Sequence, residues 1–166
     1  MTTVTFHGDV LNVAGNLPQA GQAAPEFILT GGDLGDITLA SFKGKKLLLN
    51  IFPSVDTGVC ATSVRTFNKR AAELNNAQVL CVSADLPFAA GRFCAAEGIE
   101  NVKTASSFRN PEFLTNYGVA LSSGPVRGLA ARAVVCVDEQ GKVVHSELVP
   151  EITQEPNYDA AINALK

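Results

Sequence analysis

Apolar residues in this chain gather in short runs whose spacing predicts strands and helices in alternation. Two nearly continuous apolar runs cover residues 46–52 and 78–83. Such runs are typical of strands that are covered on both faces of a sheet. Shorter runs flank turn residues rich in Gly and Asp, which predicts two hairpins before the first long strand. The four hairpin segments are residues 3–6, 10–13, 27–30 and 37–39.

Helical periodicity follows both long runs. After Pro53, apolar side chains recur at intervals of three and four residues, which predicts a helix. These side chains are Val64, Phe67, Ala71 and Leu74. Asp85 and Pro87 mark the start of a second helix, which Gly98 can end.

The second half of the chain continues the alternation. A short strand near Val102 is followed by a short helix, a strand pair with a tight turn, and a final helix. The last three of these features occupy residues 111–117, 132–138 with 142–148, and 157–165. Residues 118–131 form a long connection without periodicity, and such loops tend to be functional. The order predicts one α/β domain over residues 1–166, with helices on both faces of a sheet.

Composition narrows the class of protein. The chain has 166 residues, of which 46% are hydrophobic and 17% charged, and its net charge is −3. This balance excludes a disordered chain and gives no basic surface for nucleic acid. The apolar runs are too short to cross a bilayer. The first ten residues, MTTVTFHGDV, show no basic stretch followed by an apolar one, so we expect a cytoplasmic protein.

Four cysteines are too few for a fold built on disulfides. They are Cys60, Cys81, Cys94 and Cys136, and no two of them form a C-x-x-C pair. The spacing therefore predicts no zinc site and no local dithiol, and we expect no metal or cofactor. In a reducing compartment, such cysteines are either buried core residues or reactive thiols.

Cys60 is the strongest candidate for a reactive thiol. The segment 53–60 leaves the C-terminal end of a buried strand, the edge at which open α/β sheets bind ligands. Cys60 falls in the first turn of the predicted helix, where free N–H groups and the positive dipole end favour a thiolate. It precedes Val64 by four residues, so its side chain points to the buried face. Thr57 offers a hydroxyl on the same side, and Pro53 shields the site. The alternative is a small core residue.

Arg132 opens a strand directly after the long connection. It is either a solvated residue at a strand end or a fixed cation beside the Cys60 sulfur. Cys94, in the middle of the second helix, is either core or reactive, whereas Cys81 and Cys136 lie in apolar strands and are expected to be inert.

A cysteine hydrolase would need a histidine beside its nucleophile. His7 lies in the first hairpin and His145 in a strand, and both are expected to lie far from the loops at the predicted sheet edge. The sequence therefore gives little support to this class of enzyme.

At these residues the chain resembles the bacterial thiol peroxidases, a branch of the peroxiredoxins. The peroxiredoxin motif P-x-x-x-T-x-x-C appears as Pro53, Thr57 and Cys60. The wider match covers almost the whole chain, including the N-terminal hairpin. Its stretches are NIFPSVDTGVCATSVRTFN, VSADLPFAAGRFC, SSFRNPEFLTNYGVA, GLAARAVV and EITQEPNYDAA. The resemblance implies a thioredoxin-like peroxiredoxin fold with an added N-terminal β-hairpin.

The resemblance also implies roles for individual residues. Cys60 corresponds to the peroxidatic cysteine and Cys94 to the resolving cysteine, so an intramolecular Cys60–Cys94 disulfide is expected. Thr57 and Arg132 match the residues that hold the peroxide and the thiolate, and Pro53 the residue that shields them. We expect the first turn around Cys60 and part of residues 87–97 to unwind when the disulfide forms.

The implied activity is reduction of hydrogen peroxide and alkyl hydroperoxides, with thioredoxin as the reductant and a homodimer as the assembly. Cys81 matches a cysteine that the family does not need for turnover, and Cys136 stands where an aliphatic residue is expected. The alternative reading is a thioredoxin-fold redox-sensing or binding module without peroxide turnover.

Overall fold

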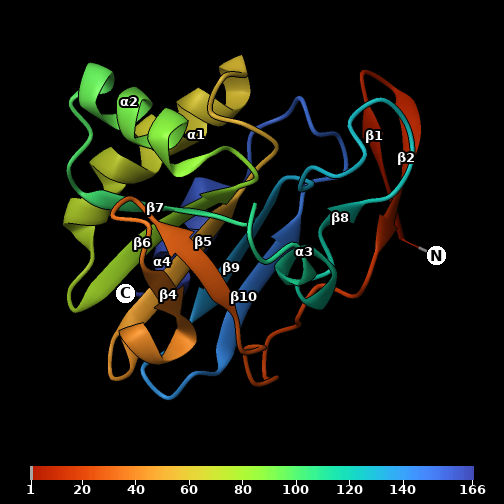
Figure 1. Ribbon diagram of the computed structural model, residues 1–166. Helices are drawn as coiled ribbons and strands as arrows, with labels where there is room; N and C mark the ends of the chain where they lie inside the picture. Colours follow the sequence, from red (N-terminus) through yellow and green to blue (C-terminus); the bar gives the residue numbers. More distant parts are fainter. Residues whose placement is uncertain (1) are drawn as a thin grey trace.

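The computed structural model describes residues 2–166 and is built around a seven-stranded sheet (Figure 1). The strands follow the order β10-β9-β5-β6-β7-β3-β4. β5 pairs parallel with β6 and antiparallel with β9, so it lies near the centre of the sheet. The bounds are β3 Ile28–Gly31, β4 Asp36–Thr38, β5 Lys46–Ile51, β6 Ala77–Ser83, β7 Val102–Ser106, β9 Ala133–Val137 and β10 Val143–Leu148.

Helices cover one face of this sheet. α1 and α4 contribute buried side chains to an apolar cluster with β5, β6 and β9, and α2 packs beside β7. The other face is covered by α3 together with a small three-stranded sheet, so the predicted helices on both faces are only partly observed. The helix bounds are α1 Gly58–Arg70, α2 Pro87–Glu97, α3 Glu112–Asn116 and α4 Tyr158–Ala164.

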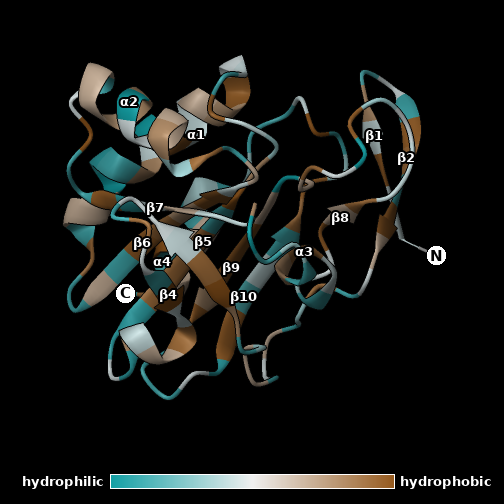
Figure 2. Ribbon diagram, in the orientation of Figure 1, coloured by the Kyte–Doolittle hydropathy of each residue, from teal (hydrophilic) through white to brown (hydrophobic). Residues whose placement is uncertain are grey.

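The continuous apolar run at β5 has the two-sided burial that the sequence predicts. Leu48 packs with Val64 and Phe67 of α1, whereas its neighbours Leu47 and Leu49 pack into the cluster on the opposite face. Figure 2 shows much of the central strands in brown, whereas the connecting loops mix teal, white and brown. Because both faces are buried, the strand carries no alternation of polar and apolar residues.

The N-terminal hairpin is confirmed, with β1 at Thr2–Phe6 and β2 at Asp9–Ala14. A strand that the sequence did not predict, β8 at Ala120–Leu121, pairs with β2 and joins the hairpin to the long connection. A two-residue strand has no periodicity from which to detect it. The connection over 118–131 is therefore partly structured, and it lies beside the hairpin in Figure 1.

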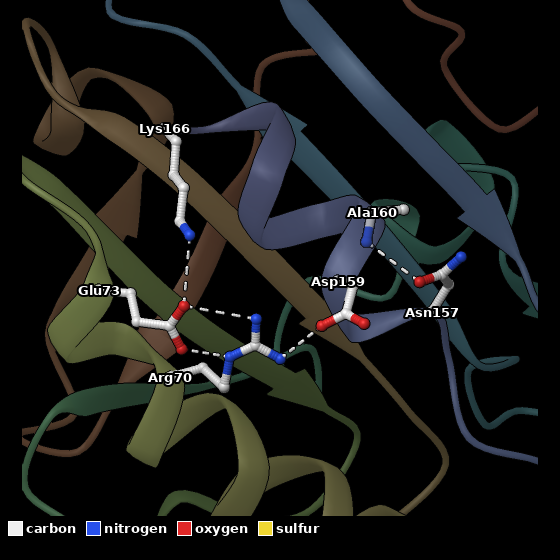
Figure 3. A network of polar contacts seen from close by, with 6 residues as sticks. All are labelled: Arg70, Glu73, Asn157, Asp159, Ala160 and Lys166. Atoms are coloured by element: carbon white, nitrogen blue, oxygen red, sulfur yellow. Dashed lines mark hydrogen bonds and ion pairs between the residues drawn. The ribbon is translucent and has the colours of Figure 1, made fainter.

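α1 ends earlier than its apolar spacing predicts. It stops at Arg70, a 3₁₀ turn covers Ala71–Glu73, and Leu74 is extended, since the chain there turns into β6. A surface network fastens this end of α1 to α4 (Figure 3). Arg70 contacts Glu73, and its Nη1 atom lies 2.9 Å from Asp159 Oδ1. Among residues 2–166, no helix is long and apolar enough to cross a membrane.

Candidate active site

Cys60 is the third residue of α1 and is fully buried, as its position in the sequence predicts. α1 begins directly after the loop that leaves the end of β5. Thr57 is the N-cap residue, but its hydroxyl does not cap the helix. It donates instead to the Ser54 carbonyl at 3.1 Å, which fixes the hydroxyl at the mouth of the site.

Arg132 lies against the Cys60 sulfur. It is only 1% exposed, and its Nη2 atom donates to Cys60 Sγ at 3.2 Å. Strand register explains the contact: Ala133 pairs with Ile51, so Arg132 stands beside the end of β5, where the chain turns toward α1. The interpretation of Arg132 as a solvated strand-end residue is therefore wrong.

The other guanidinium nitrogens of Arg132 differ in their partners. Nε donates to the Ile152 carbonyl at 2.8 Å, which orients the fork. Nη1 is buried and has no hydrogen-bond partner within residues 2–166. A buried donor without a partner is costly, so this atom is available for a ligand oxygen.

A pocket of about 360 Å³ lies over this arrangement. Pro53 and Thr57 border it together with Arg132, as expected of residues that surround one site. Its remaining wall is mostly apolar and comes from the hairpin, the first turn of α1, the long connection and the segment before α4. The apolar residues include Phe6, Val59, Val126, Leu129 and Ile152.

His7 also borders the pocket, so the expectation that both histidines lie far from the site is wrong for this residue. The turn between β1 and β2, which contains His7, lies beside the edge of the main sheet. Local sequence does not reveal this arrangement. The His7 ring packs against Phe6, with centroids 4.6 Å apart. The side chain that contacts the Cys60 sulfur is Arg132, and this arrangement does not match a Cys–His pair.

Glu151 holds the hairpin against the segment that carries Ile152. Its carboxylate accepts hydrogen bonds from the Gly8 N–H at 2.9 Å, the Thr5 hydroxyl at 3.0 Å and both donors of Thr153. The bonds from Thr153, and then the one from Gly8, lower the pKa of Glu151 to about 2. The chain of contacts runs from the hairpin through residues 151–152 to Arg132.

Asp85 and Pro87 mark the start of the second helix, as the sequence predicts. Leu86 is the N-cap residue, and Pro87 is the first residue of α2. The Asp85 carboxylate reaches back to the loop before α1, where it accepts from the Ser54 hydroxyl at 2.7 Å and the Val55 N–H at 2.8 Å. A cross-loop contact of this kind cannot be read from local sequence.

All four cysteines are free thiols. Cys81 and Cys136 are buried, and burial raises the pKa of each to about 12, as expected of inert core residues. Cys94 is half-buried on α2, and burial raises its pKa as well. Neither Cys94 nor the fully buried Cys60 lines the pocket beside Arg132. Within residues 2–166, no three His, Cys, Asp or Glu side chains gather as a metal site.

Sequence reasoning missed three contributors to the site: Asp85 as a cross-loop acceptor, Glu151 as a clamp, and the Ile152 carbonyl. A signal for all three was present, because Asp85, Glu151 and Ile152 stand inside the stretches that carry the resemblance. Their contacts join segments about 30 and 140 residues apart, which only the folded chain brings together.

Comparison with known proteins agrees with this geometry. The redoxin family matches residues 19–162, so the chain belongs to that family. Its fold is the thioredoxin-like peroxiredoxin fold. A solved structure of a peroxiredoxin-like protein from Aquifex aeolicus superposes with a TM-score of 0.93 at 39% identity, over 99% of this chain and 96% of that one.

Within the family, the chain belongs with the thiol peroxidases. It is 59% identical to the thiol peroxidases of Mycobacterium bovis and Mycobacterium tuberculosis, over 165 residues that make up 99% of each chain. The chain is therefore a peroxidase of the peroxiredoxin type, an oxidoreductase.

Proposed function

We propose that this peroxidase reduces hydrogen peroxide and alkyl hydroperoxides with Cys60 as the reacting thiol. The observation that carries the proposal is the 3.2 Å contact between Arg132 Nη2 and Cys60 Sγ in a buried site. A guanidinium that donates to sulfur favours its ionised, nucleophilic form. The adjoining pocket of about 360 Å³ has room for a small hydroperoxide, and its apolar wall suits an alkyl group.

In the first step, the ionised sulfur attacks one peroxide oxygen. A sulfur–oxygen bond forms, the O–O bond breaks, and its electron pair leaves on the second oxygen. That oxygen takes a proton and departs as water or an alcohol, while Cys60 becomes a sulfenic acid. We propose Arg132 Nη1 as one donor to the developing negative charge, and the Thr57 hydroxyl as the second once its single proton turns from the Ser54 carbonyl to the peroxide oxygen. Pro53 keeps water from the sulfur.

In the second step, we propose that Cys94 attacks the sulfenic sulfur. The disulfide forms and the oxygen leaves as water. Both cysteines lie in regular helices, and burial raises the pKa of Cys94. We propose that the first turn of α1 and part of α2 unwind so that the two sulfurs can approach bonding distance. Thioredoxin then returns two electrons through its dithiol and restores both thiols.

We further propose a homodimer that works in the cytoplasm, where thioredoxin keeps thiols reduced. Large apolar side chains stay exposed near the start of α2 and after β7. They are Leu86, Phe88 and Phe108, with Phe88 69% exposed. Sedimentation of the wild type and of Phe88→Asp tests this surface. A monomeric wild type contradicts the dimer, and a dimeric variant contradicts the role of Phe88.

The central test adds one equivalent of tert-butyl hydroperoxide to the reduced protein and maps disulfides by mass spectrometry. We expect a Cys60–Cys94 bond, and turnover when thioredoxin, its reductase and NADPH are supplied. Cys60→Ser abolishes consumption of the hydroperoxide. A Cys60–Cys81 bond, or none, overturns the role of Cys94. Stoichiometric oxidation without turnover identifies a redox-sensing module instead.

A further inference from the structure

The Asp85 carboxylate joins the two segments that lead into α1 and α2. Its Oδ1 atom accepts from the Ser54 hydroxyl at 2.7 Å. Its Oδ2 atom accepts from the Val55 N–H at 2.8 Å and from the Ser83 hydroxyl at 2.7 Å. Three donors on one partly buried carboxylate form a stronger connection than neutral hydrogen bonds would.

Ser54 is connected in turn to Thr57 at the candidate active site. The Ser54 carbonyl accepts the Thr57 N–H at 3.2 Å and the Thr57 hydroxyl at 3.1 Å. Thr57 borders the pocket, and α1 begins at the next residue. The position of the Thr57 hydroxyl therefore depends on where Asp85 holds Ser54.

The same carboxylate also stands at the base of the helix that carries Cys94. Asp85 lies two residues before Pro87, the first residue of α2, and its own N–H donates to the Ser83 hydroxyl at 3.2 Å. The starts of the two helices are thus held together by one side chain. Unwinding that brings Cys60 and Cys94 together is therefore opposed by the hydrogen bonds of the Asp85 carboxylate.

We propose that Asp85 is a positioning residue that holds residues 54–57 in the peroxide-reducing conformation and opposes the unwound conformation in which the disulfide forms. The inference rests on the proposed function. Removing the carboxylate slows oxidation of Cys60, because Thr57 loses its fixed place. It speeds disulfide formation, because the folded conformation is less favoured.

A side reaction gives a further readout. The sulfenic acid of Cys60 can react with a second hydroperoxide, which transfers one oxygen to the sulfur and leaves as water or an alcohol. The product is a sulfinic acid, in competition with attack by Cys94. When the disulfide forms faster, a smaller fraction of Cys60 reaches the sulfinic state at excess hydroperoxide.

The test compares Asp85→Ala with Asp85→Asn and with Asp56→Ala as a matched control. Asp56 is an exposed residue of the same loop, so its removal takes away one charge without the acceptor of Ser54 and Val55. In Asp85→Asn, the amide oxygen can still accept from Val55 and the NH₂ can donate to the Ser54 hydroxyl. The chain has no tryptophan, so quenched-flow mass spectrometry with tert-butyl hydroperoxide measures both steps.

In Asp85→Ala we expect Cys60 oxidation to slow by about tenfold, the loss of roughly one charge-assisted hydrogen bond. We also expect faster disulfide formation and less sulfinic acid. Asp56→Ala stays near the wild type, and Asp85→Asn falls between the wild type and Asp85→Ala, because its amide keeps hydrogen bonds to Ser54 and Val55 without the charge. The proposal is overturned if Asp85→Ala slows both steps or changes neither, or if Asp85→Asn is as defective as Asp85→Ala.

Two further measurements test the role of Asp85 if Asp85→Ala does not fold or if the proposed function fails. If Asp85→Ala does not fold, Ser54→Ala removes one of the three donors and should shift the two steps in the same opposed directions, only less. An unchanged ratio of the two rates, Cys60 oxidation to disulfide formation, overturns the proposal.

Hydrogen exchange tests the positioning without peroxide. The amides of residues 54–60 should exchange faster in Asp85→Ala than in the wild type, even if wild-type Cys60 proves unreactive and the proposed function fails. Unchanged exchange overturns positioning by Asp85.

Discussion

Arg132 and Cys60 stand 72 residues apart in the chain, and a guanidinium nitrogen of the first lies 3.2 Å from the sulfur of the second. The contact is sealed from solvent on both sides, since Arg132 is 1% exposed and Cys60 is 0% exposed. In such surroundings a charged donor acts on the sulfur with little screening. Loss of the Arg132 side chain should therefore have the most direct effect on the reactivity of the Cys60 sulfur.

Arg132→Ala should lower the second-order rate of hydroperoxide reduction by about 10²–10³, as for other losses of one donor to developing charge. The rate for Arg132→Lys should lie between those of the wild type and Arg132→Ala. It keeps the charge, but one ammonium cannot reproduce the planar fork that reaches both Cys60 Sγ and the Ile152 carbonyl. Competition kinetics with a reference peroxidase measures the rate.

Arg109→Ala serves as the control, because Arg109 is an exposed arginine that pairs with Asp36 on the surface. Its rate should match the wild type. A rate for Arg132→Ala within threefold of this control would contradict the proposed part of Arg132 in the reaction, provided that circular dichroism shows both variants folded.

Local pattern predicted the position of Cys60, but for its partner Arg132 it left two alternatives open, and only the resemblance to a known family favoured the contact. A strand end followed by a helix start is a local pattern, and the spacing to Val64 fixes which way the sulfur points. The approach of Arg132 depends on the register of β9 against β5, which no local pattern specifies. Asp85 and Pro87 correctly mark the start of α2, but the contacts of the Asp85 carboxylate with Ser54 and Val55 join two loops that are distant in the sequence, so no local pattern shows them.

The clamp made by Glu151 predicts a specific loss of stability in acid. The folded state lowers the pKa of Glu151 to about 2, below its ordinary value of 4.5, through hydrogen bonds to the ionised form. Its contribution is therefore fully present above pH 4.5 and is lost as the pH falls from there toward 2. Thermal unfolding between pH 6 and pH 3 should show a smaller decrease in Tm for Glu151→Gln than for the wild type.

Glu139→Gln is the matched control for this experiment, because Glu139 is an exposed carboxylate in the β9–β10 turn. Its Tm should fall with pH in parallel with the wild type. If Glu151→Gln also follows the wild type over the whole range, the ionised carboxylate does not hold the hairpin.

Replacing Gly118 by Ala, which adds one methyl group, should lower the free energy of unfolding strongly. Its φ is +66°, and a Cβ there would lie 2.2 Å from backbone atoms of Asn16 and Leu17. Gly44 has a similar φ of +82° but open space around it. Gly44→Ala should cost about 1–2 kcal/mol from backbone strain alone. Gly118→Ala adds overpacking of about 1–3 kcal/mol, because a backbone segment cannot move aside as a side chain can. Urea unfolding measures both, and equal costs would contradict the close approach.

The three thiols other than Cys60 should differ sharply in reactivity toward alkylation. In a Cys60→Ser chain, iodoacetamide should label Cys94 in the native state, because it is half-buried, and should do so faster as the pH rises toward its elevated pKa. Cys81 and Cys136 should react only after unfolding in guanidinium, since burial raises both pKa values to about 12 and no route to solvent is open.

Cys136→Val provides the check on this assignment. The buried Cys136 thiol donates one hydrogen bond, to the Ala161 carbonyl at 3.5 Å. Because Val has a similar volume, the substitution should change the free energy of unfolding by less than about 1.5 kcal/mol. Peroxide turnover should be unchanged and the count of thiols released by unfolding should fall by one. A loss of turnover in this variant would place Cys136 in the reaction and contradict its assignment as an inert core residue.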